Sequence, residues 1–441
     1  MKKKQLYALM GALILTANMT YSQDWPQYFG PDRNGISKEK GLLRTWPQEG
    51  PGILWSINVG IGFGGPVIKD GKIYLLDRDD KKGDKMRCFD LGTGKELWKF
   101  EYDSPGTVQF PGSRSVPAID GNLIFSCGPN GDFYCIDINT HKPVWHTNIW
   151  KEYGGGEIPK WAVTQCPLVY GDMVVVASQA PQAGVIAFEK LTGKVKWATP
   201  SLGAVGYVSP AIVKISTENH IVMITGSEGW GPNAKPSKVD GIDPQTGKVL
   251  WQYANWTCGI PIANAVDAGN GTMLITGGYR AGSAMIRVEK KADGSYNVTE
   301  LFKTPDFGTH TQPPILYNGN FYGQYTTNER KDGLVCMGTD GKVRWKTGRN
   351  PIFDKGGMIL ADGLLLITDG RTKLYLVEPD GTAFKPVASA ELLKEGGTGS
   401  GNDPVAANVG GSTQNWAPLA LSGGKLLIRD QTRLICIKVT K

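Results

Sequence analysis

The stretch Cys88-Phe-Asp-Leu-Gly-Thr-Gly-Lys-Glu-Leu-Trp98 decides the fold, because close copies of it recur along the chain. Four further copies cover residues 135–145, 187–197, 241–251 and, one residue shorter, 336–345, and each ends in tryptophan. The tryptophans recur about every 50 residues, and a degenerate copy at 285–302 fills the double interval before Trp345. A period of this length is typical of propellers and solenoids.

Each copy has the pattern of a β-hairpin. The apolar residues before the acid fit the end of one strand, and Thr-Gly or Asp-Gly supplies a turn in which glycine adopts a positive φ without steric cost. The residues that end in tryptophan return as an outer strand, whose indole can pack on the neighbouring repeat while its N–H finds a polar partner. Two shorter strands precede each copy, as in 116–126, where Asp-Gly joins two apolar runs.

A proline marks the start of the first strand in most repeats, a place where no ladder hydrogen bond is lost. These prolines are Pro66, Pro117, Pro167, Pro210, Pro261, Pro314 and Pro418. An eighth copy begins at Gly357 without the proline. Four short antiparallel strands repeated eight times predict an all-β, eight-bladed β-propeller.

The two ends of the repeat array are complementary. The last copy stops at 434–439 without room for a fourth strand, whereas 52–55 reads as an outer strand with no blade before it. We therefore expect the N-terminal strand to join the C-terminal blade, which closes the ring and removes its open edges. A solenoid would leave both fragments unpaired.

The repeated x-D-x-x-T-G-K-x-x-W phrase resembles the tryptophan-docking motif of the PQQ-like (quinoprotein-type) β-propeller family, over about residues 24–441. The opening residues 24–37 resemble the leader of exported bacterial members of that family. The resemblance implies one of two functions. The family includes alcohol and sugar dehydrogenases that carry pyrroloquinoline quinone (PQQ), and also the non-catalytic propeller lipoprotein of the outer-membrane β-barrel assembly machinery. The fold therefore does not settle the function.

The N-terminus predicts export. Three lysines (residues 2–4) precede an apolar stretch at 6–17 that is short for a membrane span, and small and polar residues follow. We interpret residues 1–22 as a signal peptide cleaved near Ser22, residues 23–50 as an N-terminal extension and residues 51–441 as the propeller, in a periplasmic or secreted protein. Removing 1–22 lowers the net charge from +7 to +4. That small excess argues against nucleic acid as a partner, and no other segment predicts a membrane span.

The cysteines predict buried thiols rather than a disulfide framework. The chain has seven, and an odd number in an exported protein leaves at least one free or bridged to another chain. Cys88, Cys135, Cys336 and Cys436 share one repeat position, which suits a small buried apolar side chain. A Cys127–Cys135 bridge across one hairpin stays open. Only four histidines are present, and no C-x-x-C spacing supports a metal or redox motif.

The candidate ligand site lies over the central channel, at the starts of the innermost strands. The side chains that we expect there are polar, basic and aromatic: Arg114, Trp161, Gln165, Tyr207, Ser209, His310, Gln312, Lys355, Gln414, Asn415 and Trp416. Such a mixture suits a glycan or an anionic small molecule. The alternative is that these groups bind channel water and cap strand ends. As catalytic candidates we single out His310, Arg114 and Tyr207.

Two long loops and three other histidines complete the inventory. The loop at 226–238 carries Glu228 and Trp230 and predicts a contact at the rim. The glycine-rich loop at 396–403 precedes no long helix, so it does not predict a dinucleotide site. The two oxygen-bearing side chains of that loop, Asn402 and Asp403, fall short of a calcium shell. His141, His146 and His220 are expected to be solvated.

Three functions follow. We favour a binding or scaffold protein whose partner, a small molecule, a glycan or a protein, docks on the channel face. A dehydrogenase using PQQ with calcium is the first alternative, but the chain lacks the adjacent Cys-Cys pair and a recognisable Glu/Asn/Asp calcium set that the resemblance would imply. A glycan-acting enzyme such as a polysaccharide lyase is the second, with His310 as acid or base, Arg114 on a uronate carboxylate and Tyr207 as proton relay. The sequence does not decide whether catalysis occurs.

Overall fold

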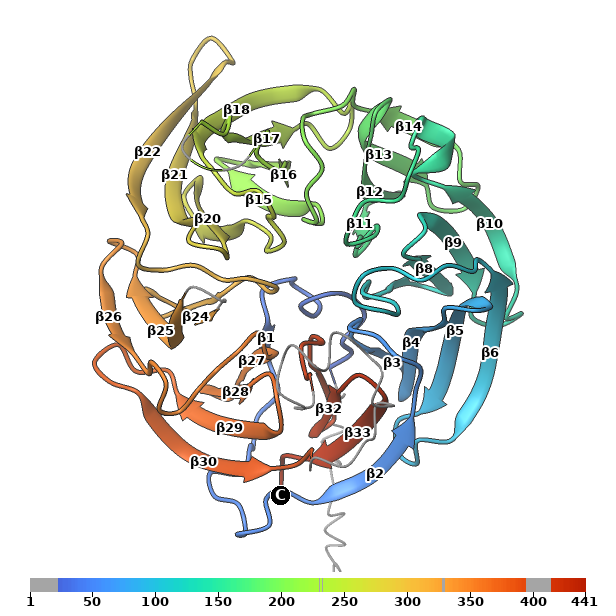
Figure 1. Ribbon diagram of the computed structural model, residues 1–441, viewed down its shortest axis with the longest axis vertical. Coiled ribbons are helices and arrows are strands. Elements are labelled where there is room, and N and C mark those ends of the chain that lie inside the picture. The colour runs from blue at the N-terminus through green and yellow to red at the C-terminus, as the bar shows by residue number, and fades with distance from the viewer. Residues whose placement is uncertain (1–22, 230, 232, 327–329, 394–413) are drawn as a thin grey trace, which may run out of the picture.

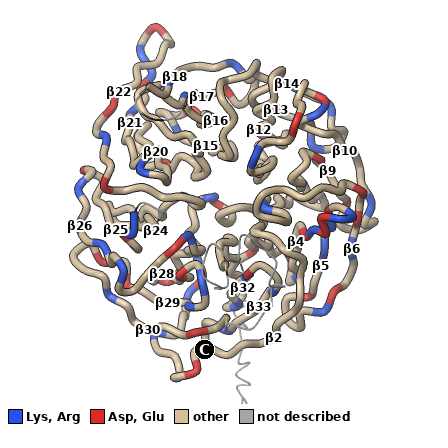
Figure 2. The backbone as a smooth tube through the Cα atoms, viewed as in Figure 1, with Lys and Arg blue, Asp and Glu red and all other residues tan. Residues whose placement is uncertain are grey.

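The computed structural model describes residues 23–229, 231, 233–326, 330–393 and 414–441. They form a closed ring of eight blades, each with four antiparallel strands (Figure 1), which confirms the predicted propeller. Within these ranges the helical content is one 3-10 turn, η1 (Lys151–Tyr153), and no helix there is both long and apolar enough to cross a bilayer. Acidic and basic residues are interspersed around the outside of the ring (Figure 2).

The first four blades follow the chain in order from the innermost strand outward. Blade 1 is β3 (Val67–Lys69), β4 (Lys72–Asp79), β5 (Gly83–Asp90) and β6 (Glu96–Asp103). Blade 2 is β7 (Ala118–Asp120), β8 (Leu123–Cys127), β9 (Asp132–Asp137) and β10 (Pro143–Asn148). Blade 3 is β11 (Leu168–Tyr170), β12 (Met173–Ala180), β13 (Ala183–Glu189) and β14 (Val195–Ala198). Blade 4 is β15 (Ala211–Ile215), β16 (Glu218–Ile224), β17 (Ser237–Ile242) and β18 (Val249–Trp256).

The next three blades repeat the arrangement. Blade 5 is β19 (Val266–Gly269), β20 (Thr272–Gly277), β21 (Gly282–Lys290) and β22 (Tyr296–Thr304), and it contains the degenerate copy of the repeat. Blade 6 is β23 (Ile315–Tyr317), β24 (Asn320–Thr326), β25 (Lys331–Gly338) and β26 (Val343–Lys346). Blade 7 is β27 (Met358–Ala361), β28 (Leu364–Thr368), β29 (Lys373–Glu378) and β30 (Lys385–Glu391). The short strand β1 (Ile36–Ser37) adds to its inner edge in parallel with β27.

Blade 8 closes the ring from both ends of the chain, as expected. It takes β31 (Ala420–Ser422), β32 (Lys425–Arg429) and β33 (Arg433–Lys438) from the C-terminal end and β2 (Ile53–Asn58) as its outer strand. β2 pairs antiparallel with β33, with Trp55 opposite Cys436. The N-terminal strand therefore supplies the fourth strand that the last repeat lacks.

The outer-strand tryptophans join neighbouring blades by packing on the turn glycine of the next repeat. Trp55 of blade 8 lies over Gly94 of blade 1, whose φ is +71°, and a Cβ on Gly94 would stand 2.7 Å from the indole. The Trp55 indole also donates to the Leu91 carbonyl oxygen at 3.1 Å. The same ring-on-glycine contact joins Trp145 to Gly193 and Trp197 to Gly247, and an indole N–H reaches the next blade's carbonyl from Trp145, Trp197 and Trp345. The Thr-Gly turn is thus both a turn signal and a docking surface.

Two histidines replace this contact where the turn glycine is absent, and they correct one expectation. His141 is exposed but stacks on Trp98, with ring centroids 4.5 Å apart. His220 was expected to be solvated, yet it is buried, and its Nδ1 accepts the Trp251 indole N–H at 2.9 Å. The expectation was wrong because blade 5, the next blade, has a degenerate turn, so Trp251 finds its partner within blade 4. His146 is exposed and stacks on Tyr134.

All seven cysteines are buried free thiols, including Cys127 and Cys135, so the hairpin bridge that the sequence left open does not form in the structure. Burial raises the pKa of Cys88 and Cys135 to about 12. A neutral thiol at these inward positions packs as a small apolar group. This agrees with the role predicted from their repeat position.

Substituting Gly94 tests the docking contact. Gly94→Ala adds the steric conflict with Trp55 to the cost of a positive φ, whereas Gly71→Ala in the same blade carries a similar φ, +68°, with nothing within 4 Å of the new Cβ. We expect Gly71→Ala to lower the unfolding free energy by about 1 kcal/mol and Gly94→Ala by about 2 kcal/mol or more. Urea unfolding of both variants measures the difference. Equal losses would show that the indole does not constrain the turn.

Asp240 in β17 makes folding stability depend on pH. Its carboxylate is fully buried, accepts only from Gln252 at 2.6 Å among the described residues, and has a pKa raised to about 6 by burial. The folded chain therefore holds the Asp240 proton more tightly than the unfolded chain, and stability falls as pH rises from about 4 to about 6. We expect Asp240→Asn to gain about 2 kcal/mol over wild type between pH 4 and pH 8. Thermal unfolding at both pH values checks this, and a pH-independent difference would contradict it.

Candidate functional site

A cavity of about 800 Å3 lies at the centre of the ring. Its lining comes from the segments just before the innermost strands of the blades, because the propeller brings these segments together around one axis. Residues three before the strand-starting proline line it in several blades: Phe63, Arg114, Thr164, Tyr207 and Thr311. The repeat therefore brings these segments together, and one position of the repeat contributes a lining side chain from several blades.

The N-terminal segment closes one end of the channel. Trp25 pairs with Ile68 of blade 1, the Pro26 carbonyl accepts from Ile119 of blade 2, and Ile36 pairs with Leu360 of blade 7. Between them, the Arg33 guanidinium donates to the carbonyl oxygens of Pro167 at 3.1 Å and Pro210 at 3.3 Å, in blades 3 and 4. The segment thus crosses the ring, and its Tyr28 lines the cavity. Burial lowers the pKa of Arg33 and raises that of Tyr28.

One wall of the cavity combines aromatic rings with a lysine. Trp416 stacks on Phe63 with ring centroids 5.4 Å apart, and Phe110 approaches Trp416 at 6.1 Å. The Lys355 Nζ lies 4.5 Å from the Trp416 ring centroid and 2.5 Å from Asp354 Oδ1. This cation–π contact holds a positive charge over an apolar face, which is a suitable surface for a planar anion.

Arg114 contributes a second cation, which is anchored in its own loop. Its Nη2 donates to the carbonyl oxygens of Gln109 and Phe110, while Nη1 is buried and has no hydrogen-bond partner in the described structure. Burial lowers the pKa of Arg114 to about 10, so the guanidinium remains charged at neutral pH. The unpartnered Nη1 leaves Arg114 able to donate to an anionic ligand.

His310 is a buried, neutral imidazole on the cavity wall. It packs on the Gly278 backbone and edge-on to Tyr279, with ring centroids 4.5 Å apart, and its Nδ1 has no partner among the described residues. Burial, and secondarily the charge of Lys355, lowers the pKa of His310 to about 3. Tyr207 packs edge-on to Trp161, and burial raises its pKa, so its hydroxyl stays protonated. The neutral His310 ring can therefore accept a hydrogen bond, and the Tyr207 hydroxyl can donate one.

The predicted ligand-binding residues divide into two groups. Trp161, Ser209, Gln312, Lys355 and Trp416 line the cavity, as do the three residues that we singled out as catalytic. The other group does not line it. Gln165 instead bridges the Val208 carbonyl and the Ala177 amide, Gln414 bonds Gln431, Asn415 is almost completely buried, and Glu228 pairs with Lys235 on an exposed loop. Trp230 and the loop at 396–403 lie outside the described residues.

Several lining residues were not anticipated from the sequence: Tyr28, Phe63, Phe110, Asn264, Tyr279, Asp354 and Arg371. Phe63 and Asp354 could have been found by comparing the position three before each first strand, because Asp354 stands at that distance from Gly357. Tyr28 and Phe110 lie on segments outside the repeat, so the repeat could not place them.

The residues present do not fit a calcium ion. The described lining contains one carboxylate, Asp354, and it is already paired with Lys355. No group of three His, Cys, Asp or Glu side chains suited to a metal occurs among the described residues. The Asn264 Oδ1, buried without a partner, offers one neutral oxygen, whereas Ca2+ takes six to eight oxygen ligands. By contrast, four basic side chains and a cluster of aromatic rings face the cavity, and these fit a planar organic anion.

The protonation state of His310 can be measured directly. We expect the imidazole nitrogens, followed by 15N NMR, to keep the chemical shifts of a neutral ring from pH 5 to pH 8, because the pKa is lowered to about 3. His310→Gln assigns the signal. A titration midpoint between pH 5 and pH 8 would show that the cavity solvates the ring.

Known proteins share this architecture. The family model described as "Outer membrane protein assembly factor BamB" matches residues 82–257. The quinohemoprotein alcohol dehydrogenase of Comamonas testosteroni is 23% identical over 408 residues, which cover 81% of this chain and 51% of that protein. The dehydrogenase subunit of the alcohol dehydrogenase (quinone) of Gluconobacter oxydans is 24% identical over 43% of this chain and 31% of its own. This chain thus spans about half the length, or less, of these curated relatives.

Solved structures show the same fold at low identity. A europium-containing methanol dehydrogenase superposes with a TM-score of 0.61 at 14% identity, covering 92% of this chain and 89% of that one. BamB from Moraxella catarrhalis superposes with a TM-score of 0.56 at 10% identity, covering 88% and 99%. The structural matches thus show a shared propeller fold, and the sequence relatives are proteins named as quinohemoprotein or quinone alcohol dehydrogenases.

Proposed function

We propose that this chain, a PQQ-like β-propeller, is an exported oxidoreductase that binds a planar, carboxylated quinone in its central cavity and oxidises a hydroxyl-bearing substrate there. The observation that carries the proposal is the wall where Lys355 lies over Trp416 and Trp416 stacks on Phe63. The sequence relatives, named as quinone-dependent alcohol dehydrogenases, support this alternative above the binding or scaffold role favoured from the sequence.

The cavity residues would hold such a quinone by its rings and its carboxylates. The aromatic rings of Trp416 and Phe63 offer a flat apolar face, while Lys355 and the free Nη1 of Arg114 offer positive charge to carboxylates. Charge-assisted hydrogen bonds of this kind are stronger in a cavity than in water. Asp354 keeps the Lys355 ammonium in place, and the crossing segment with Tyr28 limits water entry from one end.

His310 is the residue that would take the hydroxyl proton of the substrate. When bound, the quinone would accept the two electrons and the hydrogen that leave the substrate carbon as the carbonyl forms. His310 presents an unpartnered Nδ1 to receive the remaining proton. An anionic ligand would offset the charge of Lys355, the second cause of the lowered His310 pKa, and would so increase the basicity of the ring. The Tyr207 hydroxyl can hydrogen-bond to the substrate oxygen.

A non-catalytic role remains the second candidate, because the family model that matches residues 82–257 carries the description of an assembly factor. A scaffold protein would use the same channel face for a protein segment rather than for a quinone. Direct quinone binding separates the two proposals.

The test is a titration of the protein with PQQ, followed by calorimetry and by quenching of tryptophan fluorescence. We expect saturable binding that Lys355→Met weakens about tenfold, since a charged hydrogen bond contributes about 1.5–3 kcal/mol. Lys196→Met is the matched control, because Lys196 also pairs with an aspartate at 2.5 Å, but on the outer strand β14. His310→Gln should bind PQQ normally and lose dye-linked oxidation of an alcohol panel.

The other outcomes are equally informative. Absence of PQQ binding by a folded protein would overturn the oxidoreductase proposal and leave the scaffold role. Binding and cleavage of a uronic oligosaccharide without PQQ would instead support the lyase alternative. Equal losses in Lys355→Met and Lys196→Met would show that the aromatic wall is not the binding surface.

A further inference from the structure

The loop at 104–114 connects blade 1 to blade 2 and carries three cavity-lining side chains, Gln109, Phe110 and Arg114. No strand or helix lies within it, and in the described structure the Arg114 side chain donates to the carbonyl oxygens of Gln109 and Phe110, which belong to the loop itself. The position of these side chains therefore depends on what holds the two ends of the loop.

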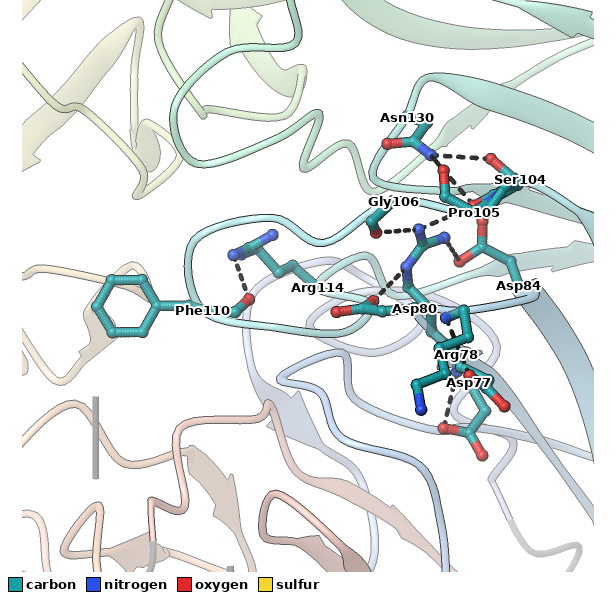
Figure 3. Close-up of polar contacts among 12 residues, drawn as sticks. Asp77, Arg78, Asp80, Asp84, Ser104, Pro105, Gly106, Phe110, Arg114 and Asn130 are labelled. Atoms are coloured by element: carbon teal, nitrogen blue, oxygen red, sulfur yellow. Dashed lines mark hydrogen bonds and ion pairs between the residues drawn. The ribbon is translucent and has the colours of Figure 1, made fainter. Parts of the chain in front are cut away.

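One buried arginine holds the first end of the loop, residues 104–106, which we call the loop root. The Arg78 side chain, at the end of β4, is fully buried, and its Nη2 donates to the carbonyl oxygens of Ser104 at 2.8 Å and Gly106 at 2.7 Å. Figure 3 shows this guanidinium at the root of the loop, with Phe110 projecting away from it toward the channel. One nitrogen thus fixes two carbonyls two residues apart, while the other two nitrogens of the planar guanidinium face Asp80 and Asp84, a combination that lysine cannot reproduce.

Two carboxylates balance the charge of Arg78. Its Nε lies 2.7 Å from Asp80 Oδ1, and its Nη1 lies 3.0 Å from Oδ1 of the fully buried Asp84. Replacing such a buried ion pair with apolar groups is often neutral or stabilising, so stability alone does not account for the network. The two carboxylates do fix the orientation of the guanidinium, and with it the direction in which Nη2 donates to the loop.

Blade 2 also forms hydrogen bonds with the loop root. The Asn130 Nδ2 donates to Ser104 O at 3.2 Å, Ser104 Oγ at 3.1 Å and Pro105 O at 3.3 Å. The Ser104 hydroxyl in turn donates to Asp132 Oδ2 at 2.5 Å. The loop root is therefore held between two blades, and movement of either blade would be transmitted to Phe110.

A second buried arginine fixes the far end of the loop through its neighbour. The Ser113 carbonyl accepts from Phe63 at 2.7 Å and Gly64 at 3.0 Å. Arg429 of β32 donates to Gly64 O at 2.6 Å and Gly60 O at 3.0 Å. Both ends of the loop are thereby tied to guanidinium groups in the interior.

We propose that Arg78 is a positioning residue that sets the shape of the cavity by holding the root of loop 104–114, and so directs Phe110 and Arg114 toward the ligand. The effect on ligand binding rests on the proposed function, whereas the effect on the loop does not. Arg78 acts through the loop backbone and does not line the cavity.

The test compares Arg78→Lys with Arg87→Lys. Arg87 lies in the same blade and pairs with Asp77 at 2.9 Å and Glu96 at 3.0 Å, and it also donates to the Asn58 carbonyl oxygen of β2, away from the loop. Hydrogen exchange followed by mass spectrometry reports amide protection for each segment, and PQQ titration reports affinity. We expect Arg78→Lys to lower the protection of 104–114 about tenfold, with the other blades unchanged, and to weaken PQQ binding by a similar factor. Arg87→Lys should do neither.

The outcomes separate the two proposals. Protection lost uniformly across the blades, or retained in 104–114, would overturn the role of Arg78. If wild type binds no PQQ, the proposed function fails, but hydrogen exchange still decides the role of Arg78. Should Arg78→Lys not fold, Asn130→Ala removes three bonds to the same root without leaving a buried charge. Because Arg78 stays in place in that variant, we expect 104–114 to keep its protection, and a loss of about tenfold would show that Asn130 and not Arg78 holds the loop.

Discussion

The contact between an outer-strand indole and the turn glycine of the next blade is the constraint on which the structure depends. It fixes how each blade sits against its neighbour, and the same relation repeated around the ring brings eight inner strands to one axis. The partner of the indole differs between blades. Where the Thr-Gly turn is missing, an imidazole takes its place, stacked on Trp98 from His141 and bonded to Trp251 from His220.

Basic side chains gather at the centre of the ring, in and around the cavity. Lys355 lies over Trp416, Arg114 keeps a buried Nη1 without a partner, and Arg33 is satisfied by carbonyl oxygens of two blades. Lys355 is paired with Asp354, whereas Arg114 has no carboxylate partner in the described structure, and a buried cation of that kind favours an anion that completes it. The N-terminal segment and the blade loops together line one cavity that is rich in basic and aromatic side chains. This combination of shape and charge is the basis of the proposed binding of a planar anion.

The sequence predicts the fold more fully than the site, for physical reasons. The repeated phrase contains its own turn, its own docking residue and its own spacing, so the eight blades and the closure by β2 follow from local pattern. His310, Arg114, Tyr207, Lys355 and Trp416 could be placed at the cavity because they lie in the short segments just before the innermost strands. Gln165 and Asn415 occupy similar positions but point into blade packing, which local pattern does not reveal. Tyr28 and Arg33 depend on the path of a segment outside the repeat, and His220 depends on a degenerate neighbouring blade. These residues are determined by non-local contacts that composition and spacing do not encode.

The pairing of β2 with β33 also dictates the order of events in folding. These strands are separated by nearly the whole described chain, so blade 8 is the last to become complete as the polypeptide is made. Until β33 is available, β2 has no strand to pair with, and such an edge invites association with other chains; its Ile53 and Leu54 stay exposed even in the finished ring. Contacts this distant in sequence also form slowly. The closure that stabilises the finished ring thus leaves the growing chain prone to aggregation until β33 has been made and can pair with β2.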